Sequence, residues 1–473
     1  MSRELLIAAS PGELWAADCI DGKLAALRVL RPGRRGRVGE LILGRVVALR
    51  PELPAVLVDI GLDRPAFLSA EDTVPRGDIA RLHEGQAILV QVRKEARADK
   101  APGLSMRVRL RGRLLELMPT RPGITAAKGF DAAARERLSG LLAAVSGPEQ
   151  GFALRPGAAT ASPTEIEHEA DALRARWRAL EDAVRAARAP EVLEDPAASL
   201  ETLLDEFADT FPDAVVIDDR AVFAEARSWF LSYDPALARR LILHRESSPL
   251  FEHYGIAEEI ALALAPNVPV MGGGGLTIEH TAAAILIDVD SGGGGRRREA
   301  ADAILALNTA AAAEVARQIR LRNLAGPIVI DFIGMRRTGD RDRVRAALAA
   351  ALAAALIADA DIELLGWTRL GHFELTRRRL HASPVELLFE RAPGAGLVKR
   401  PVTVALEALW TLARAAAASP ARAPALHVHP EVAAALDGEA GPARHQLEER
   451  LGRAVAVIAD PTRPRASFDI RLG

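Results

Sequence analysis

The feature that most constrains the fold is a pair of apolar, β-branched runs that each end in aspartate. The first, AAAILIDVDSGGGG at 282–295, stops at Asp288 and Asp290 and passes into glycine, and the second, GPIVIDFIGM at 326–335, places Asp331 after another apolar run. The segment 299–322 between them has the pattern of a helix. Together these segments predict a βαβ unit with parallel strands and a right-handed crossover, so the acidic ends of both strands should meet at one edge of a sheet.

This arrangement predicts a metal site. Ligands bind outside the carboxyl ends of parallel strands, and Asp288 and Asp290, two residues apart, share one face of a regular strand. Carboxylates crowded together without a cation repel one another. Magnesium prefers oxygen ligands and is typically held by one or two carboxylates together with substrate phosphate. We therefore expect Mg²⁺, with Mn²⁺ as the alternative ion, at a site for phosphate chemistry.

Length and composition indicate a soluble protein of several domains. At 473 residues the chain exceeds one ordinary hydrophobic core, and 49% hydrophobic with 26% charged residues is typical of globular proteins. The longest apolar segment, 346–358, is shorter than the roughly 20 residues of a membrane span and predicts a packed helix. The N-terminus shows no signal peptide, so we expect a cytoplasmic protein without a membrane partner.

The cysteine content and the net charge argue against several other classes of protein. Cys19 is the only cysteine, so no intrachain disulfide, no disulfide-linked partner and no cysteine-rich zinc site is expected. His427 and His429 are interpreted as alternate residues of a strand rather than as metal ligands. The formal net charge of −2 argues against a uniformly basic nucleic-acid binder, which leaves local clusters of arginine to decide.

The segment 38–118 has an all-β pattern, with five short strands that suggest a small barrel. In its last predicted strand, arginine recurs at every second position, at Arg107, Arg109, Arg111 and Arg113. A regular strand would place these guanidinium groups on one face, where they suit a phosphate backbone, although a solvated edge strand is the alternative. Residues 163–188 predict an amphipathic helix with a scaffold role.

Further arginines lie near the Asp-bearing strands in the sequence. They are Arg296, Arg297, Arg298, Arg317, Arg320, Arg377, Arg378 and Arg379. They could hold phosphate, and the alternative for each is a solvated helix face or a structural role. The glycines at 292–295 are not followed by Lys-Ser/Thr, which argues against a nucleoside-triphosphate loop.

Three stretches in this order resemble the core of the ribonuclease E/G family: GGGGLTIEHTAAAILIDVDSG, NTAAAAEVARQIRLRNLAGPIVIDFIGM and GWTRLGHFELTRRRL. The N-terminal stretch GELILGRVVALRPELPAVLVDIGLDRPAFLSAED is similar to the S1-type OB-fold of that family, GFALRPGAATAS to its 5′-phosphate sensor, and the C-terminal segment to its small domain. The resemblance covers nearly the whole chain and points to the short, ribonuclease G-like members.

The resemblance implies a mixed α+β and α/β multidomain fold. The implied parts are a ribonuclease H-like subdomain at 1–37 and 215–277, an inserted S1-type OB-fold barrel at 38–118, a 5′-sensor-like region at 119–214, a DNase I-like catalytic, metal-binding subdomain at 278–400, and a small C-terminal α/β domain at 401–473.

It also implies an activity, namely magnesium-dependent endonucleolytic cleavage of single-stranded RNA that leaves 5′-phosphate ends, in RNA processing or decay. By motif, Asp288 and Asp331 fall on the two metal-binding aspartates, and Asp290 stands where the family usually has Asn. Phe67 matches the aromatic residue of the OB-fold that contacts RNA, and Arg155 matches the sensor arginine. The RNA-binding set is completed by Arg107, Arg109, Arg297, Arg320, Arg377 and Arg379.

The sequence departs from the family pattern at several positions. The cysteine pair of the family's zinc link is missing from ERAPGAGLVKRPVT, so no zinc is expected, although a homodimer is still compatible with the small domain. Pro156 replaces the sensor threonine, Leu57 a second aromatic residue, Ala282 a glutamate and Gly334 an acidic residue. Two alternatives therefore stay open: an RNA-binding protein with weak or lost nuclease activity, and a small-molecule phosphohydrolase.

Overall fold

The fold is known from a computed structural model that divides into two compact units. It describes residues 2–31, 36–50, 52–96, 101–126, 132–145, 150–159, 161–195, 200–205, 207, 211–233, 236–281, 283–292, 301–355, 362–378, 382–392, 396–418 and 424–472. The main unit comprises Met1–Pro32 and Pro212–Gly473, and the inserted unit comprises Gly33–Phe211. The predicted division into five domains is finer than these two units and stays a prediction.

A closed five-stranded barrel forms the first part of the inserted unit. Its strands follow the order β4 (Leu41–Arg50), β5 (Ala55–Asp59), β6 (Ala66–Ser69), β8 (Gly103–Ser105) and β7 (Ala87–Lys94), and β7 pairs with β4 to close it. The interior is filled by aliphatic side chains from every strand, among them Val46, Val58, Leu68, Val90 and Leu104. β13 (Glu191–Glu194) adds to β4. The barrel expected from the sequence is confirmed.

The prediction of a long arginine-bearing strand at the end of the barrel is wrong. β8 ends at Ser105, and the chain continues as β9 (Leu110–Arg111) and β10 (Leu115–Met118), which belong to a second sheet with β12 (Gly151–Leu154) and β11 (Gly123–Ala126). The break follows from packing, because Val108, Leu110, Leu114 and Leu115 turn into a separate core. The four arginines therefore do not line one regular strand.

Helix α2 (Pro163–Ala186) covers this second sheet, as the amphipathic pattern predicted, while α1 (Ala132–Val145) and α3 (Leu200–Asp205) complete the unit. A capping box starts α2: the Ser162 side chain accepts a hydrogen bond from the Glu165 backbone N–H, and the Glu165 side chain accepts one from the backbone of Ser162. Ile166, Leu173 and Leu180 are buried on one face of the helix.

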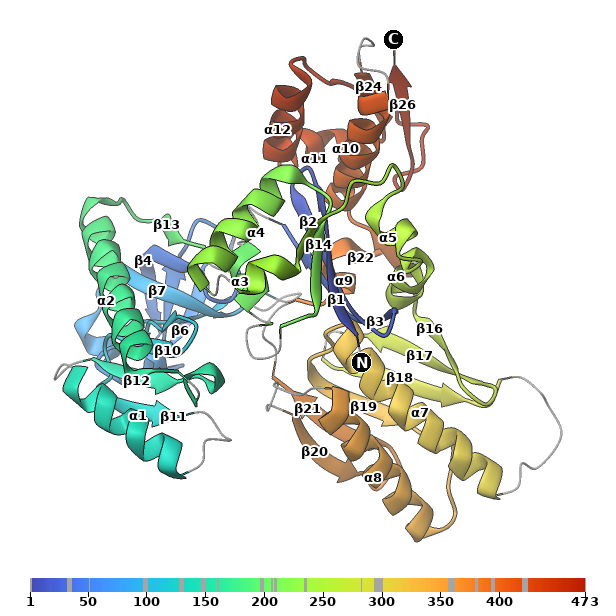
Figure 1. Cartoon of the computed structure of the whole chain (residues 1–473), viewed down its shortest axis with the longest axis horizontal. Coiled ribbons are helices and arrows are strands. Elements are labelled where there is room, and N and C mark those ends of the chain that lie inside the picture. The colour runs from blue at the N-terminus through green and yellow to red at the C-terminus, as the bar shows by residue number, and fades with distance from the viewer. Residues whose placement is uncertain are drawn as a thin grey trace. The chain divides into compact units, whose positions relative to one another are not determined.

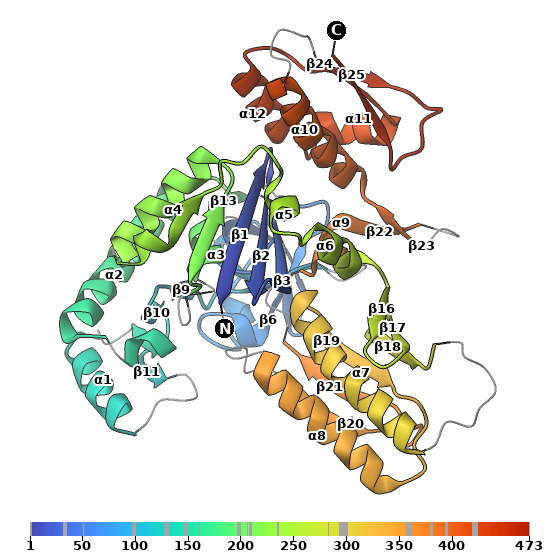
Figure 2. The ribbon, with the colours of Figure 1, turned by 45° about the vertical axis from the view of Figure 1, so that its right-hand side comes forward.

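The main unit begins with a sheet of order β15 (Leu241–Leu243), β14 (Ala214–Ile217), β1 (Arg3–Ser10), β2 (Glu13–Ile20) and β3 (Lys23–Leu30). β1, β2 and β3 lie side by side in Figure 2. Helices α4 (Arg220–Tyr233), α5 (Leu250–His253) and α6 (Ala257–Leu264) follow in the chain.

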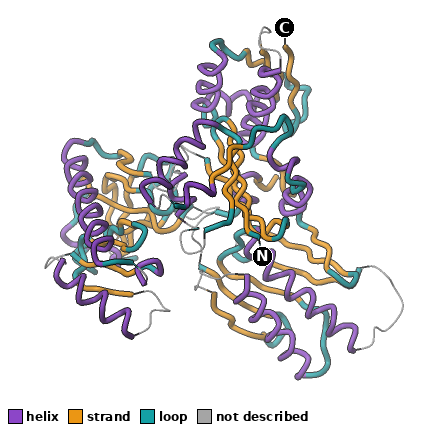
Figure 3. Tube along the Cα trace, viewed as in Figure 1, coloured by secondary structure: helices purple, strands orange, loops and turns teal. Residues whose placement is uncertain are grey.

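A mixed six-stranded sheet comes next, of order β16 (Asn267–Val270), β17 (Gly274–His280), β18 (Ile285–Asp290), β19 (Gly326–Asp331), β21 (Phe373–Arg377) and β20 (Ile362–Trp367). β18 and β19 are parallel and are connected through α7 (Ala301–Leu321), which confirms the predicted βαβ unit. α7 and α8 (Thr338–Ala355) lie side by side along one face of this sheet (Figures 1 and 3).

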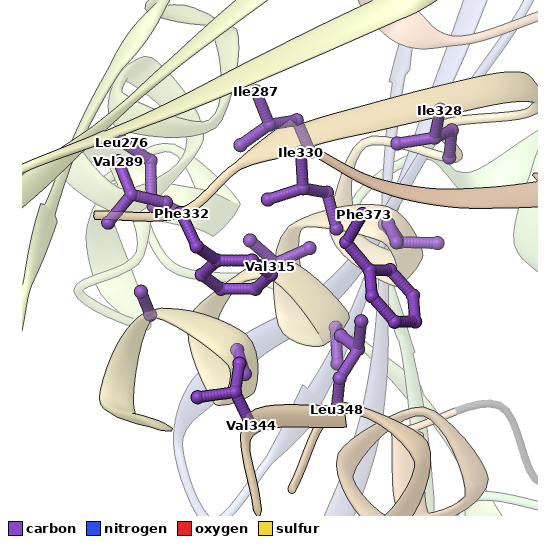
Figure 4. Packing of buried hydrophobic residues seen from close by; sticks show 14 of the residues in the cluster. Leu276, Ile287, Val289, Val315, Ile328, Ile330, Phe332, Val344, Leu348 and Phe373 are labelled. Carbon is purple, nitrogen blue, oxygen red and sulfur yellow. The ribbon is translucent and has the colours of Figure 1, made fainter. Parts of the chain in front are cut away.

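The core of this layer lies between the sheet and the two helices. Figure 4 shows Ile287, Ile330 and Phe373 from the strands facing Val315 of α7 and Leu348 of α8. All five side chains are at most 1% exposed. The apolar segment 346–358 is thus the packed helix that was predicted, as far as α8 extends, and within the described residues no helix is long and apolar enough to cross a membrane.

The C-terminal part contains a hairpin of β22 (Phe389–Ala392) and β23 (Gly396–Lys399) and a three-stranded sheet of β25 (Ala456–Ala459), β24 (Pro424–Val428) and β26 (Phe468–Leu472). Its helices are α9 (Pro384–Leu388), α10 (Pro401–Ala418), α11 (Pro430–Asp437) and α12 (Gly441–Leu451). His427 lies in β24 as predicted, but His429 does not: it is the N-cap of α11, and its Nδ1 accepts a hydrogen bond of 3.3 Å from the Glu431 backbone N–H.

One carboxyl group in the first sheet of the main unit is perturbed. Asp218 follows β14, and its Oδ1 accepts a 2.8 Å hydrogen bond from the backbone N–H of Ala9 in β1. Burial raises the pKa of Asp218 to about 6, and the neighbouring carboxylate of Asp219 adds to the rise. Because this pKa lies above the ordinary value of 3.8, protonation favours the folded state. That contribution is complete below about pH 4 and is lost as the pH rises through 6.

We therefore expect Asp218→Asn to stabilise the protein at pH 7 and to change its stability little near pH 4. The amide oxygen still accepts from Ala9, while the buried charge is gone. Thermal unfolding across this pH range measures the effect, with Asp342→Asn on the exposed face of α8 as the control. A variant that unfolds earlier than the parent at pH 7 would contradict this account.

Candidate active site

The two faces of the mixed sheet differ in chemistry because side chains alternate along each strand. In β18, Ile285, Ile287 and Val289 are buried, while Leu286, Asp288 and Asp290 are exposed. In β19, Asp331 is likewise exposed next to buried Ile330. We call the side that carries Asp288, Asp290 and Asp331 the open face. The prediction that the three carboxylates share one face at one sheet edge is therefore consistent with the structure.

Asp288 and Asp331 are direct neighbours on this face. They are register partners in the parallel β18–β19 pair, which places their Cα atoms opposite each other on adjacent strands. Adjacent strands are about 4.8 Å apart, so two carboxylates at one register position are within reach of a common cation. The alternation of buried and exposed side chains in both strands fixes this register, since a slip of one residue would turn the aspartates into the core.

Asp290 lies two residues further along β18 than Asp288 and has different contacts. Its Oδ1 accepts a 2.7 Å hydrogen bond from the backbone N–H of Gly292, where the chain turns with a positive φ of 72°. Its Oδ2 lies over Gly275 of β17, where an added Cβ would approach that oxygen to 2.8 Å. Glycine at 275 thus leaves space for this carboxylate, which has one oxygen already hydrogen-bonded to the turn.

Residues of the neighbouring strands extend the site on both sides of Asp288 and Asp331. Asn267 of β16 pairs with Thr277 of β17, and Thr277 pairs with Asp288. On the other side, Ile330 pairs with Phe373, and His372 is the residue just before β21. The Nε2 atom of His372 is 3.8 Å from Oδ1 of Asp331. We call Asn267, Thr277, Asp288, Asp331 and His372 the polar row.

Sequence reasoning missed Thr277 and His372. Neither belongs to an acidic run, and the signal that would find them is the antiparallel pairing of β17 and β21 with the Asp-bearing strands. A single sequence does not provide that register.

The donor set suits a hard divalent cation that keeps open coordination positions. Two carboxylates on one face are what magnesium usually takes from a protein, the remaining positions being filled by water and phosphate oxygen. Among the described residues, no group of three or more His, Cys, Asp or Glu side chains is gathered closely enough to hold a metal ion. The paired carboxylates of Asp288 and Asp331 fit a site of this open kind.

Two of the predicted RNA-binding arginines are engaged within the main unit. Nη2 of Arg320 donates to Oδ2 of buried Asp18 at 2.6 Å. Nη1 of Arg377, a residue that is 4% exposed, donates to Oδ1 of Asn323 and to the carbonyl of Leu324, both at 3.0 Å. These guanidinium groups connect α7 and its C-terminal turn to neighbouring strands. Arg297 and Arg379 lie outside the described residues.

The other predicted RNA-binding residues lie in the inserted unit. Phe67 is 39% exposed on the barrel surface and pairs with Leu57 of β5. Arg155 is 9% exposed, and its Nη1 is 2.9 Å from Oδ2 of Asp205. Nη1 of Arg109 is 3.2 Å from Oε2 of Glu116, and Arg107 is half-buried. Of these, Phe67 has the exposure that stacking on a base requires, and the RNA-binding roles of all four stay predictions.

The Asp-bearing strands fall inside a family match. The family "Ribonuclease E/G family" matches residues 109–380, which is more than half of the chain. The chain belongs to the ribonuclease E/G family.

Similarity to individual members of the family extends over nearly the whole length of the chain. The chain is 30% identical to Ribonuclease G of Escherichia coli strain K12 over 489 aligned positions, which cover 99% of each chain. It is 31% identical to Ribonuclease G of Haemophilus influenzae, with 87% of each chain covered. Ribonuclease E of a Nostoc species is 30% identical over 76% of this chain and 54% of its own length.

We expect Arg377→Lys to destabilise the protein by about 1–3 kcal/mol, because lysine lacks the planar fork and leaves buried oxygens of Asn323 and Leu324 without their donor. Chemical denaturation measures the loss. Arg345→Lys on the exposed side of α8 should change the stability by no more than about 0.5 kcal/mol. Equal stability of the two variants would show that Arg377 has no structural role.

Proposed function

We propose that this protein is an endoribonuclease that cleaves single-stranded RNA and leaves 5′-phosphate ends, with Mg²⁺ at Asp288 and Asp331. The observation that carries the proposal is the register pairing of these two aspartates on the open face, inside the part of the chain that matches the ribonuclease E/G family. The relatives named Ribonuclease G over the full length support an RNA substrate. Mn²⁺ is expected to replace Mg²⁺ at the same oxygens.

The chemistry follows from the polar row. A bound divalent cation supplies charge stabilisation at phosphorus and a more acidic water. Asp288 and Asp331 would hold this cation from adjacent strands, and their carboxylates would orient the attacking water in line with the scissile bond. Asp290, anchored by the Gly292 N–H, keeps a third negative charge beside the pair and strengthens cation binding at the strand ends.

RNA recognition is assigned to other surfaces. Phe67 on the barrel offers an exposed ring for base stacking, which is worth about 1–3 kcal/mol per base in single-strand binders. We further propose that the barrel is an S1-type OB-fold, that the sheet of β1–β3, β14 and β15 is ribonuclease H-like, and that the protein works in the cytoplasm in RNA processing or decay, with a homodimer as its assembly.

The cleavage test uses a 5′-labelled, unstructured oligoribonucleotide with magnesium or with chelator. Asp288→Asn and Asp331→Asn should each lower the cleavage rate by at least about 100-fold, because one ligand of the cation is lost. Asp342→Asn, an exposed aspartate of α8, is the matched control and should cleave like the parent.

Binding separates the enzyme from the alternative. A gel shift in chelator shows whether the aspartate variants still bind RNA. Tight RNA binding by the parent without magnesium-dependent cleavage would favour an RNA-binding protein with lost nuclease activity. Parent-like cleavage by either aspartate variant would remove the metal assignment.

A further inference from the structure

The proposed function gives no role to His372, the member of the polar row that lies beside Asp331. Its Nε2 lies 3.8 Å from Oδ1 of Asp331, and its ring is 36% exposed. The separation is too long for a hydrogen bond. It is short enough for both atoms to approach one cation, given metal–ligand bonds of about 2 Å to nitrogen and oxygen.

The position of this imidazole is fixed by a tight turn between β20 and β21. The Thr368 backbone N–H donates to the His372 carbonyl at 2.8 Å, and the His372 N–H donates to the Thr368 hydroxyl at 3.2 Å. Gly371 supplies the positive φ of 95° that the turn requires. The neighbouring Phe373 is fully buried, so the alternation of β21 directs His372 to the open face.

The row therefore offers three side chains, two from adjacent strands and one from the turn that leads into β21. Asp288 and Asp331 are register partners of β18 and β19, and His372, the residue before β21, lies beside Asp331. Asp288 and His372 flank it from either side, and both are at least partly exposed. Among the described residues no three such side chains are gathered closely enough to hold a metal ion, so binding by all three requires the exposed side chains to rotate toward a cation above β19.

We propose that His372 is a third protein ligand of the divalent cation and that it shifts the preference of the site from Mg²⁺ toward Mn²⁺. This proposal rests on the metal site of the proposed function. Magnesium selects oxygen ligands almost exclusively, whereas transition-metal cations accept imidazole nitrogen. A site with two carboxylates and one imidazole thus gains affinity for Mn²⁺ that it does not gain for Mg²⁺.

The experiment measures Mn²⁺ binding to the full chain by electron paramagnetic resonance, without RNA. His372→Leu should weaken Mn²⁺ binding by at least about tenfold, the lower end of the effect of losing a supporting residue at a metal site. Competition with Mg²⁺ should show a much smaller change in Mg²⁺ affinity. His445→Leu is the matched control, because His445 is also paired with a carboxylate, Glu449 at 3.3 Å, but on the distant helix α12.

Spectroscopy distinguishes a His372 side chain that binds the cation from one that only lies near it. Electron spin echo modulation of the Mn²⁺-loaded parent should show coupling to a directly bound ¹⁴N nucleus, retained in His445→Leu and lost in His372→Leu. If Asp331→Asn abolishes Mn²⁺ binding while the parent shows no ¹⁴N coupling, the role of His372 is wrong and the metal site stands. If Mn²⁺ does not bind the parent, or binds Asp288→Asn and Asp331→Asn as it binds the parent, both proposals fail.

Discussion

The structure depends most on the parallel register of β18 and β19. This register places the Cα atoms of Asp288 and Asp331 opposite each other, while Ile287 and Ile330 turn into the core beneath α7 and α8. Because side chains alternate along a strand, burying the two isoleucines places the two aspartates on the open face. The clustering of like charges is a consequence of hydrophobic packing, and it is the reason why we propose a cation at this position.

Two of the arginines near the Asp-bearing strands stabilise the fold. Arg320 and Arg377 donate to partners inside the main unit, Asp18 and Asn323 respectively, and their RNA-binding roles stay predictions. A buried guanidinium group stabilises a fold only when its donors are satisfied, and removing it leaves its partners desolvated. Both contacts lie at the C-terminal end of α7, where they connect the helix to β2 and the turn after it to β21.

Much of the fold follows from local pattern. The βαβ unit, the barrel and α2 were predicted from periodicity, because burial of one face imposes a period of two on strands and of about 3.6 on helices. The family resemblance assigned Asp288 and Asp331. The extended arginine strand failed because Leu114 and Leu115 pack into a second core, and His429 was misplaced because a helix cap interrupts the alternation. Thr277 and His372 were missed because cross-strand register is a long-range property, which no local pattern of one sequence encodes.

The central claim is that two adjacent strands hold one divalent cation between Asp288 and Asp331. The most direct measurement is anomalous scattering from crystals grown with Mn²⁺. The account predicts a single strong peak within about 2.3 Å of a carboxylate oxygen of each aspartate. A peak bound to only one of them, or a manganese site elsewhere on the chain with this face empty, would contradict it.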